Sequence, residues 1–132
     1  MGTRSTTKIY DNGKLVLALY KQYDGYPSDW GEELKTFIQS GVFVNGISDS
    51  KLPRNKTHIF NGIGDFALQL VTRFKHKAGD LYATTEDDTE EYNYKIEFNH
   101  NFETRKAKKI LSSEEEDADD EKFFYEEDII IK

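Results

Sequence analysis

The sequence contains no cysteine, and this absence excludes disulfides, thiolate metal ligands and cysteine nucleophiles together. It also contains no apolar run close to the roughly 20 residues that a membrane-spanning helix needs, so we expect no membrane partner. A chain of 132 residues is long enough for one well-packed core but too short for separate cofactor and substrate domains. These absences favour a single non-secreted domain without a bound cofactor.

Negative charge is concentrated near the C-terminus. Residues 1–113 carry sixteen Lys and Arg against fifteen Asp and Glu, whereas residues 114–132 carry two against ten. The net charge of −7 disfavours direct nucleic-acid binding. A small basic cluster that precedes the acidic run leaves a local contact with nucleic acid open; it consists of Arg105, Lys106, Lys108 and Lys109.

Strand and turn patterns predict an antiparallel sheet. Asn12-Gly13 separates two β-prone runs, 8–10 and 14–23, and Asn-Gly suits the positive φ angles of a hairpin turn. Both faces of the second run are apolar, so we expect it at the centre of the sheet. Two later strands are expected at 80–85 and 92–100, joined by an acidic connector at 86–91.

Two segments have the spacing of amphipathic helices. In the first, 28–41, Ser28 or Asp29 is expected to cap the start and Gly41 to end the helix. In the second, Asn61 is expected to cap a helix that continues to Lys77. The apolar positions that predict the two helices are Trp30, Leu34, Phe37 and Ile38 in the first, and Ile63, Phe66, Ala67, Leu70, Val71 and Phe74 in the second. We therefore predict a single α+β domain at 1–104, an antiparallel sheet packed with two helices, followed by an extension at 105–132.

The extension is basic and then acidic, but it also contains apolar residues. The runs 123–125 and 129–131 are β-prone and unfavourable to leave in water. We expect the extension to pack as a strand, either on this domain or against a partner.

Chemical motifs are few. Gly62-Ile63-Gly64-Asp65-Phe66-Ala67 matches the loose dinucleotide pattern G-x-G-x-x-A, but the preceding strand is short and Asp80, at the right distance, begins a strand. Capping by Asn61 and a tight turn explain the same glycines, although an anion at the helix start remains an alternative. The three histidines lack metal-ligand spacing, no G-x-S-x-G occurs, and we expect neither a metal nor a catalytic centre. Asp24 and Asp65 form a carboxylate pair only if their turns lie side by side.

Three segments together resemble a family of small, functionally uncharacterised proteins of bacteriophages, other viruses and their hosts. The segments are Tyr20–Pro27 (YKQYDGYP), Asn61–Gly64 (NGIG) and Gly79–Tyr82 (GDLY), and the resemblance covers about residues 4–98. It implies an α+β fold and a viral setting, in the host cytoplasm or the virion, and it transfers no catalytic residues.

We therefore expect a non-enzymatic, virus-associated interaction protein with a host or viral protein partner. One form of this function is an acidic mimic of nucleic acid that inhibits a host protein. A minor structural component of the virion and a binder of a small ligand or nucleotide are the alternatives. The expected partner-binding residues are Glu114, Glu115, Glu116, Asp117, Asp119, Asp120 and Glu121. The expected ligand-binding residues are Tyr23, Asp24, Gly25, Tyr26, Asn61, Gly62, Gly64 and Asp65.

Overall fold

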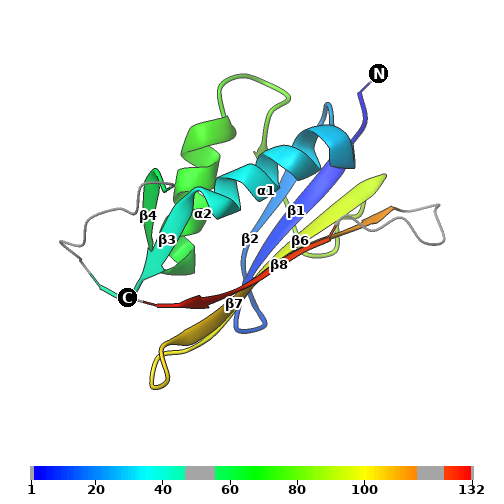
Figure 1. Ribbon diagram of the computed structural model, residues 1–132. Coiled ribbons are helices and arrows are strands. Elements are labelled where there is room, and N and C mark those ends of the chain that lie inside the picture. Colours follow the sequence, from blue (N-terminus) through cyan, green and yellow to red (C-terminus); the bar gives the residue numbers. More distant parts are fainter. Residues whose placement is uncertain (1, 47–55, 116–123, 132) are drawn as a thin grey trace.

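The computed structural model describes residues 2–46, 56–115 and 124–131 and has two layers. One layer is a six-stranded sheet in the order β5-β2-β1-β6-β7-β8. Its strands are β1 (Ser5–Asp11), β2 (Lys14–Lys21), β5 (Tyr82–Ala83), β6 (Tyr92–Asn101), β7 (Lys106–Glu115) and β8 (Phe124–Ile130). The other layer lies on one face of this sheet (Figure 1) and contains α1 (Glu32–Gln39), α2 (Gly62–Phe74) and the paired strands β3 (Gly41–Val44) and β4 (His58–Asn61). The α+β prediction is confirmed, and no helix within the described ranges is long and apolar enough to cross a membrane.

The hairpin of β1 and β2 is confirmed. Asn12 has a φ of 48° and Gly13 a φ of 84°, as an Asn-Gly hairpin turn requires. The expectation of a central second strand holds only in part, because β2 pairs with the two-residue strand β5 on its outer side. Its first half therefore has an open edge, and Leu15 and Val16 are exposed.

The sheet is mixed, and the prediction of a purely antiparallel sheet is wrong. β1 and β6 run parallel, with Ser5 opposite Tyr92 and Asp11 opposite Phe98, while the other neighbours in the main sheet are antiparallel. The helical layer returns the chain to the end of the sheet where β1 begins. β6 therefore starts beside the start of β1 and runs in the same direction.

The stretch expected as an extension forms strands of the main sheet. β7 pairs with β6 over ten residue pairs, from Tyr92 opposite Glu115 to Asn101 opposite Lys106. β8 pairs with β7, and Ile131 after it is 2% exposed within the core. The C-terminal stretch thus packs on its own domain, and the expected boundary at residue 104 lies in the turn between β6 and β7.

Both helices bury the predicted faces but begin differently from expectation. A five-residue π-helical turn, η1 (Pro27–Gly31), precedes α1. Tyr26, rather than Ser28 or Asp29, is the N-cap of this turn, and it makes no side-chain capping hydrogen bond. Pro27 explains this start, because its fixed φ and missing N–H suit a first helical position.

α2 begins at Gly62, which has a φ of +83°, and ends three residues before the expected Lys77. The expectation that Asn61 caps α2 is wrong for its side chain, which makes no capping hydrogen bond. The Asp65 carboxylate instead accepts from the Asn61 N–H at 2.8 Å, while the Asn61 side chain accepts from Gly46 N–H. The first turn of α2 is thus held by a residue inside the helix.

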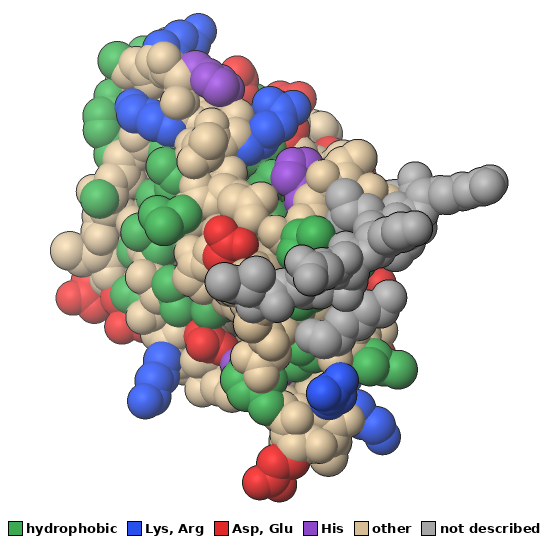
Figure 2. Space-filling model, turned by 90° about the vertical axis from the view of Figure 1, so that its left-hand side faces the viewer, with side chains coloured by type: hydrophobic (Ala, Val, Ile, Leu, Met, Phe, Trp, Pro, Cys, Tyr) green, Lys and Arg blue, Asp and Glu red, His purple; other side chains and the backbone are tan. Residues whose placement is uncertain are grey.

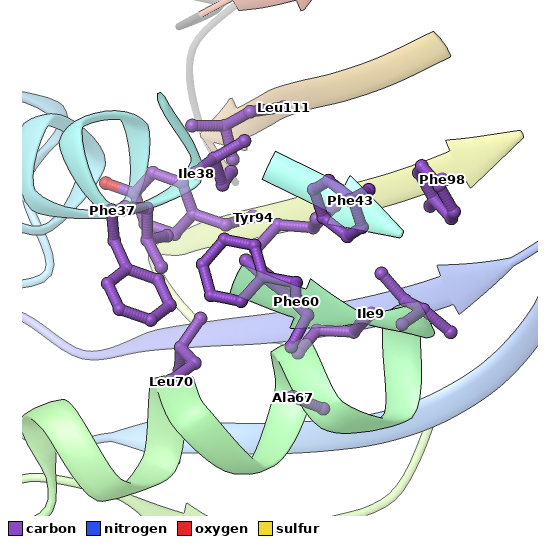
Figure 3. Packing of buried hydrophobic residues seen from close by; sticks show 14 of the residues in the cluster. Ile9, Phe37, Ile38, Phe43, Phe60, Ala67, Leu70, Tyr94, Phe98 and Leu111 are labelled. Carbon is purple, nitrogen blue, oxygen red and sulfur yellow. The ribbon is translucent and has the colours of Figure 1, made fainter. Parts of the chain in front are cut away.

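The core lies between the two layers (Figure 3). Aromatic rings dominate it: Phe37 contacts Phe60 at a centroid distance of 5.4 Å, and Phe43 stacks on Phe98 at 4.4 Å. The single tryptophan, Trp30, is 1% exposed, and its indole N–H donates to Thr7 Oγ1 at 2.8 Å. This hydrogen bond satisfies the one polar group that such a buried ring carries.

Candidate functional site

The Gly25 turn is explained by packing. Gly25 N–H donates to Thr3 O at 3.0 Å, and the Tyr94 hydroxyl donates to Gly25 O at 2.5 Å. A Cβ at Gly25 would lie 2.7 Å from the Ser5 Cβ, so only glycine fits. Asp24 beside it has a φ of 57°, a conformation that Asp tolerates in turns.

The Tyr20–Pro27 and Gly79–Tyr82 segments meet. Gln22 N–H donates to Gly79 O at 3.1 Å, and Gly79 N–H donates to the Tyr82 hydroxyl at 2.8 Å. A Cβ at Gly79 would lie 2.6 Å from the Tyr23 ring, while the Tyr26 ring lies 6.0 Å from that of Tyr92. The aromatic residues of these segments therefore pack where the end of β2 meets the loop before β5, and we call this place the β2–β5 junction.

The other predicted turn lies far from this junction. Asn61, Gly62, Gly64 and Asp65 stand at the start of α2, whereas Gly79 follows its end. Thirteen helical residues separate the two places by about 20 Å at 1.5 Å per residue. Asp24 and Asp65 therefore do not form a carboxylate pair, and β4, four residues long and paired with β3, is not the first strand of a dinucleotide-binding unit.

The acidic residues are only partly described. Glu114 and Glu115 end β7, while Glu116, Asp117, Asp119, Asp120 and Glu121 lie outside the described residues. Because Tyr92 pairs with Glu115, the acidic connector 86–91 lies at the same end of the sheet as these two glutamates. The described residues also contain no group of three or more His, Asp or Glu that could hold a metal ion.

A cavity of about 670 Å³ lies between β3 and the β7–β8 edge of the main sheet, and we call it the Lys109 slot. Its walls are largely apolar, and its polar groups are mostly lysines and carboxylates. It is lined by Gly41, Val42, Phe43, Lys56, Lys106, Ala107, Lys109, Glu127, Asp128, Ile129 and Ile130. None of the eight predicted ligand-binding residues lines it.

Lys109 is the unusual group of this slot, because the residue is only 3% exposed. The alternation of β7 turns Ala107, Lys109 and Leu111 toward the helical layer, where Phe43 of β3 lies over the lysine. Its ammonium donates to Ile38 O at 3.3 Å and lies 5.5 Å from the centre of the Phe43 ring. A buried ammonium requires such partners, since isolated charge is strongly disfavoured away from water.

A carboxylate and a second lysine complete the charged part of the slot. Glu127 Oε2 lies 3.4 Å from Lys109 Nζ, and the Tyr125 hydroxyl donates to the same Glu127 oxygen. Burial lowers the pKa of Lys109; Glu127 opposes this shift, and Lys56 adds to it. Burial alone would raise the pKa of Glu127, but the Tyr125 hydroxyl, Lys109 and Lys56 together lower it. The Glu127 carboxylate thus occupies a position where cationic and hydroxyl groups converge.

The two-residue period of β7 is a sequence pattern that could have indicated the Lys109 slot. Lys109 belongs to the basic cluster of Arg105, Lys106 and Lys108 in sequence, but the two-residue period of β7 places it on the apolar face with Ala107. Lys108 points to the opposite face, where its ammonium pairs with Glu126 at 2.7 Å. The cluster is therefore divided between the two sides of the sheet.

A second cavity, of about 830 Å³, lies between α1 and the C-terminal end of α2, and we call it the α1–α2 cleft. Most of its lining residues are polar, and they carry both signs of charge. Its lining residues are Lys21, Ser28, Asp29, Glu32, Glu33, Thr36, Phe37, Ser40, Thr57, His58, Arg73, Phe74, His76, Lys77 and Asp80. On the face of the molecule that Figure 2 shows, basic and histidine side chains gather at the top, over the C-terminal end of α2.

The fold and the slot define an α+β protein with a buried ammonium group in a cavity of ligand size. No protein-family model, no curated protein and no solved structure matches the chain. Its function is therefore inferred from its own geometry.

Proposed function

We propose that this protein is a non-enzymatic binding protein that takes a small organic anion into the Lys109 slot. The observation that carries the proposal is a lysine 3% exposed beside a cavity of about 670 Å³. Ligand cavities typically combine apolar walls with a few charged or polar groups, and titratable groups with shifted pKa values are common in them. The slot has both properties.

The anionic class of ligand follows from the charges. Lys109 and Lys56 both act on the Glu127 carboxylate, and the Tyr125 hydroxyl donates to it. A ligand carboxylate or phosphate would compete for the same donors, while Phe43 and Ile129 would contact its apolar part. The resemblance to viral proteins suggests that such binding takes place in the cytoplasm of an infected host or in a virion.

The test compares anions with matched neutral analogues. Benzoate is set against benzamide, and adenosine monophosphate against adenosine, with affinities measured by calorimetry and sites located by amide chemical shifts. We expect the anion of at least one pair to bind with shifts in β3, β7 and β8. Equal binding of the neutral analogues, or shifts elsewhere, would refute the proposal.

Matched variants test the role of the lysine. Lys109→Met removes the buried charge, and the double variant Lys109→Met/Glu127→Gln also avoids leaving an unpaired carboxylate. Lys108→Met is the control, because Lys108 is the next residue of the same strand on the opposite face. We expect about tenfold weaker anion binding in both Lys109 variants and no change in the control, since one charge-assisted hydrogen bond is worth roughly this much.

A second candidate function is the acidic interaction with a protein partner. It is favoured by the meeting of the connector 86–91 with Glu114 and Glu115 at one end of the sheet. A triple variant removes three exposed carboxylates at this end and leaves the strands in place; it combines Asp87→Asn, Glu91→Gln and Glu114→Gln. If this end binds a basic partner, the triple variant will lose a partner captured from host cells at low salt; retention of every captured protein would contradict it.

A further inference from the structure

The α1–α2 cleft has two walls of opposite charge. The acidic wall consists of Asp29 in the π-helical turn and of Glu32 and Glu33 at the start of α1. The basic wall consists of Arg73 at the end of α2 and Lys77 after it, with the Asp80 carboxylate beside them; Lys21 of β2 also lines the cleft. π-helical turns occur frequently at functional sites, so the place of Asp29 is itself informative.

The two walls do not neutralise each other across the cleft. Within the described ranges, no ion pair of 4 Å or less involves Glu32, Glu33 or Arg73. On the basic wall, the Asp80 carboxylate accepts hydrogen bonds from the backbone N–H groups of His76 and Lys77, each at 2.9 Å. Opposite charges therefore line one cleft but remain too far apart to pair directly.

His58 adds a ring nitrogen that can accept a hydrogen bond. Its Nδ1 lies 3.0 Å from Ser40 Oγ and 2.9 Å from Thr57 Oγ1. The Ser40 hydroxyl donates to Phe37 O at 2.6 Å, so Ser40 Oγ accepts from Nδ1–H in the tautomer that carries its proton there. In that tautomer Nε2 is an acceptor, and it makes no hydrogen bond among the described residues.

We propose that the α1–α2 cleft binds a short zwitterionic peptide. The terminal ammonium of the peptide faces Glu32 and Glu33, and its terminal carboxylate faces Arg73. His58 Nε2 accepts a peptide N–H, and the Phe37 and Phe74 rings contact the peptide chain between its ends. A volume of about 830 Å³ lies within the range of ligand sites and exceeds what a single amino acid fills. This site is separate from the Lys109 slot and does not depend on the proposal made for it.

The experiment uses one peptide with three charge patterns. Tri-alanine is the zwitterion, N-acetyl-tri-alanine is the anion, and tri-alanine amide is the cation; free alanine distinguishes an amino-acid site from a peptide site. Binding is followed by amide chemical shifts of the full chain. We expect shifts confined to 28–40, 57–58 and 73–80, with the zwitterion binding about tenfold more tightly than either capped peptide. Equal affinities for the three peptides, tightest binding of free alanine, or no binding would overturn the proposal.

Variants test the two walls separately. Glu33→Gln should weaken binding of the zwitterion and of the cationic amide but not that of the acetylated anion. Arg73→Gln should weaken binding of the zwitterion and of the acetylated anion but not that of the cationic amide. Lys75→Gln is the control, because Lys75 is a nearby cation whose ammonium lies over the Tyr82 ring and which does not line the cleft. An effect of Lys75→Gln equal to that of Arg73→Gln would show only general charge attraction and would refute the two-wall model.

Discussion

The pair formed by Lys109 and Glu127 should be coupled more strongly than a closer pair on the outer face of the same strands. The perturbation is a double-mutant cycle made of Lys109→Met, Glu127→Gln and the combination of the two. The comparison cycle is Lys108→Met and Glu126→Gln, whose charged atoms lie 2.7 Å apart against 3.4 Å for the first pair. Distance alone would therefore favour the comparison pair.

Burial reverses that order. At 3.4 Å and an effective dielectric constant of about 20, two unit charges attract by about 5 kcal/mol, and the desolvation of Lys109 offsets much of this gain. The Lys109 side chain is 4% exposed and that of Glu127 36%, so water screens only one partner. We expect a coupling free energy of about 1–2 kcal/mol for this pair. For Lys108 and Glu126, whose side chains are 42% and 37% exposed, we expect a clearly smaller coupling free energy, because water screens both partners.

The assay is urea unfolding followed by the fluorescence of Trp30, the single tryptophan, which becomes exposed on unfolding. The two cycles are measured at neutral pH and at two salt concentrations, and only the outer pair should weaken clearly in high salt. A coupling in the Lys109 cycle no larger than that in the Lys108 cycle would refute the argument that burial strengthens the inner pair.

Three further predictions use the same unfolding assay. Leu70→Ala removes a side chain that is 0% exposed and should destabilise the protein by about 2–5 kcal/mol, whereas Leu68→Ala on the same helix, at a residue that is 68% exposed, should change stability by less than about 0.5 kcal/mol. Gly62→Ala places a side chain at a φ of +83° and should destabilise by about 1 kcal/mol or more, whereas Gly64→Ala, with open space around its Cβ, should be neutral or stabilising by about 0.5–1 kcal/mol; the reverse order would contradict the turn assignment. Because the pKa of Glu127 is lowered, its stabilisation is present above its ordinary pKa of 4.5 and is lost as the pH falls through the lower folded value; Glu127→Gln should therefore flatten the acid limb of the stability curve, and an unchanged limb would contradict this.

Local sequence patterns were sufficient for several elements. The Asn12-Gly13 turn was predictable because it needs two positive φ angles, a property of those two residue types. The buried faces of both helices followed from spacing: Leu34, Phe37 and Leu70 are all buried as predicted. The caps were not predictable in the same way, since several neighbouring polar side chains satisfy a capping pattern and only one geometry is adopted.

The candidate sites were much less predictable. The glycine turns were expected to bind ligand, yet Gly25 is required by the approach of Ser5, and Gly62 lies at the far end of α2. Lys109 appeared as one member of a basic cluster, and only the passage of β3 over β7 turns it into a buried group beside a cavity. Such contacts join residues up to 71 positions apart, and no local pattern encodes them.

The sequence by itself thus determined the class of the fold, the hairpin, the two amphipathic helices and the tendency of the C-terminal apolar residues to form a strand, because these depend on backbone preferences and on periodic burial within one segment. The tertiary structure alone decided the parallel pairing of β1 with β6, the covering of Lys109 and the separation of charges across the α1–α2 cleft. The physical reason is that pairing direction, desolvation and electrostatic complementarity depend on which distant segments the packed core brings together.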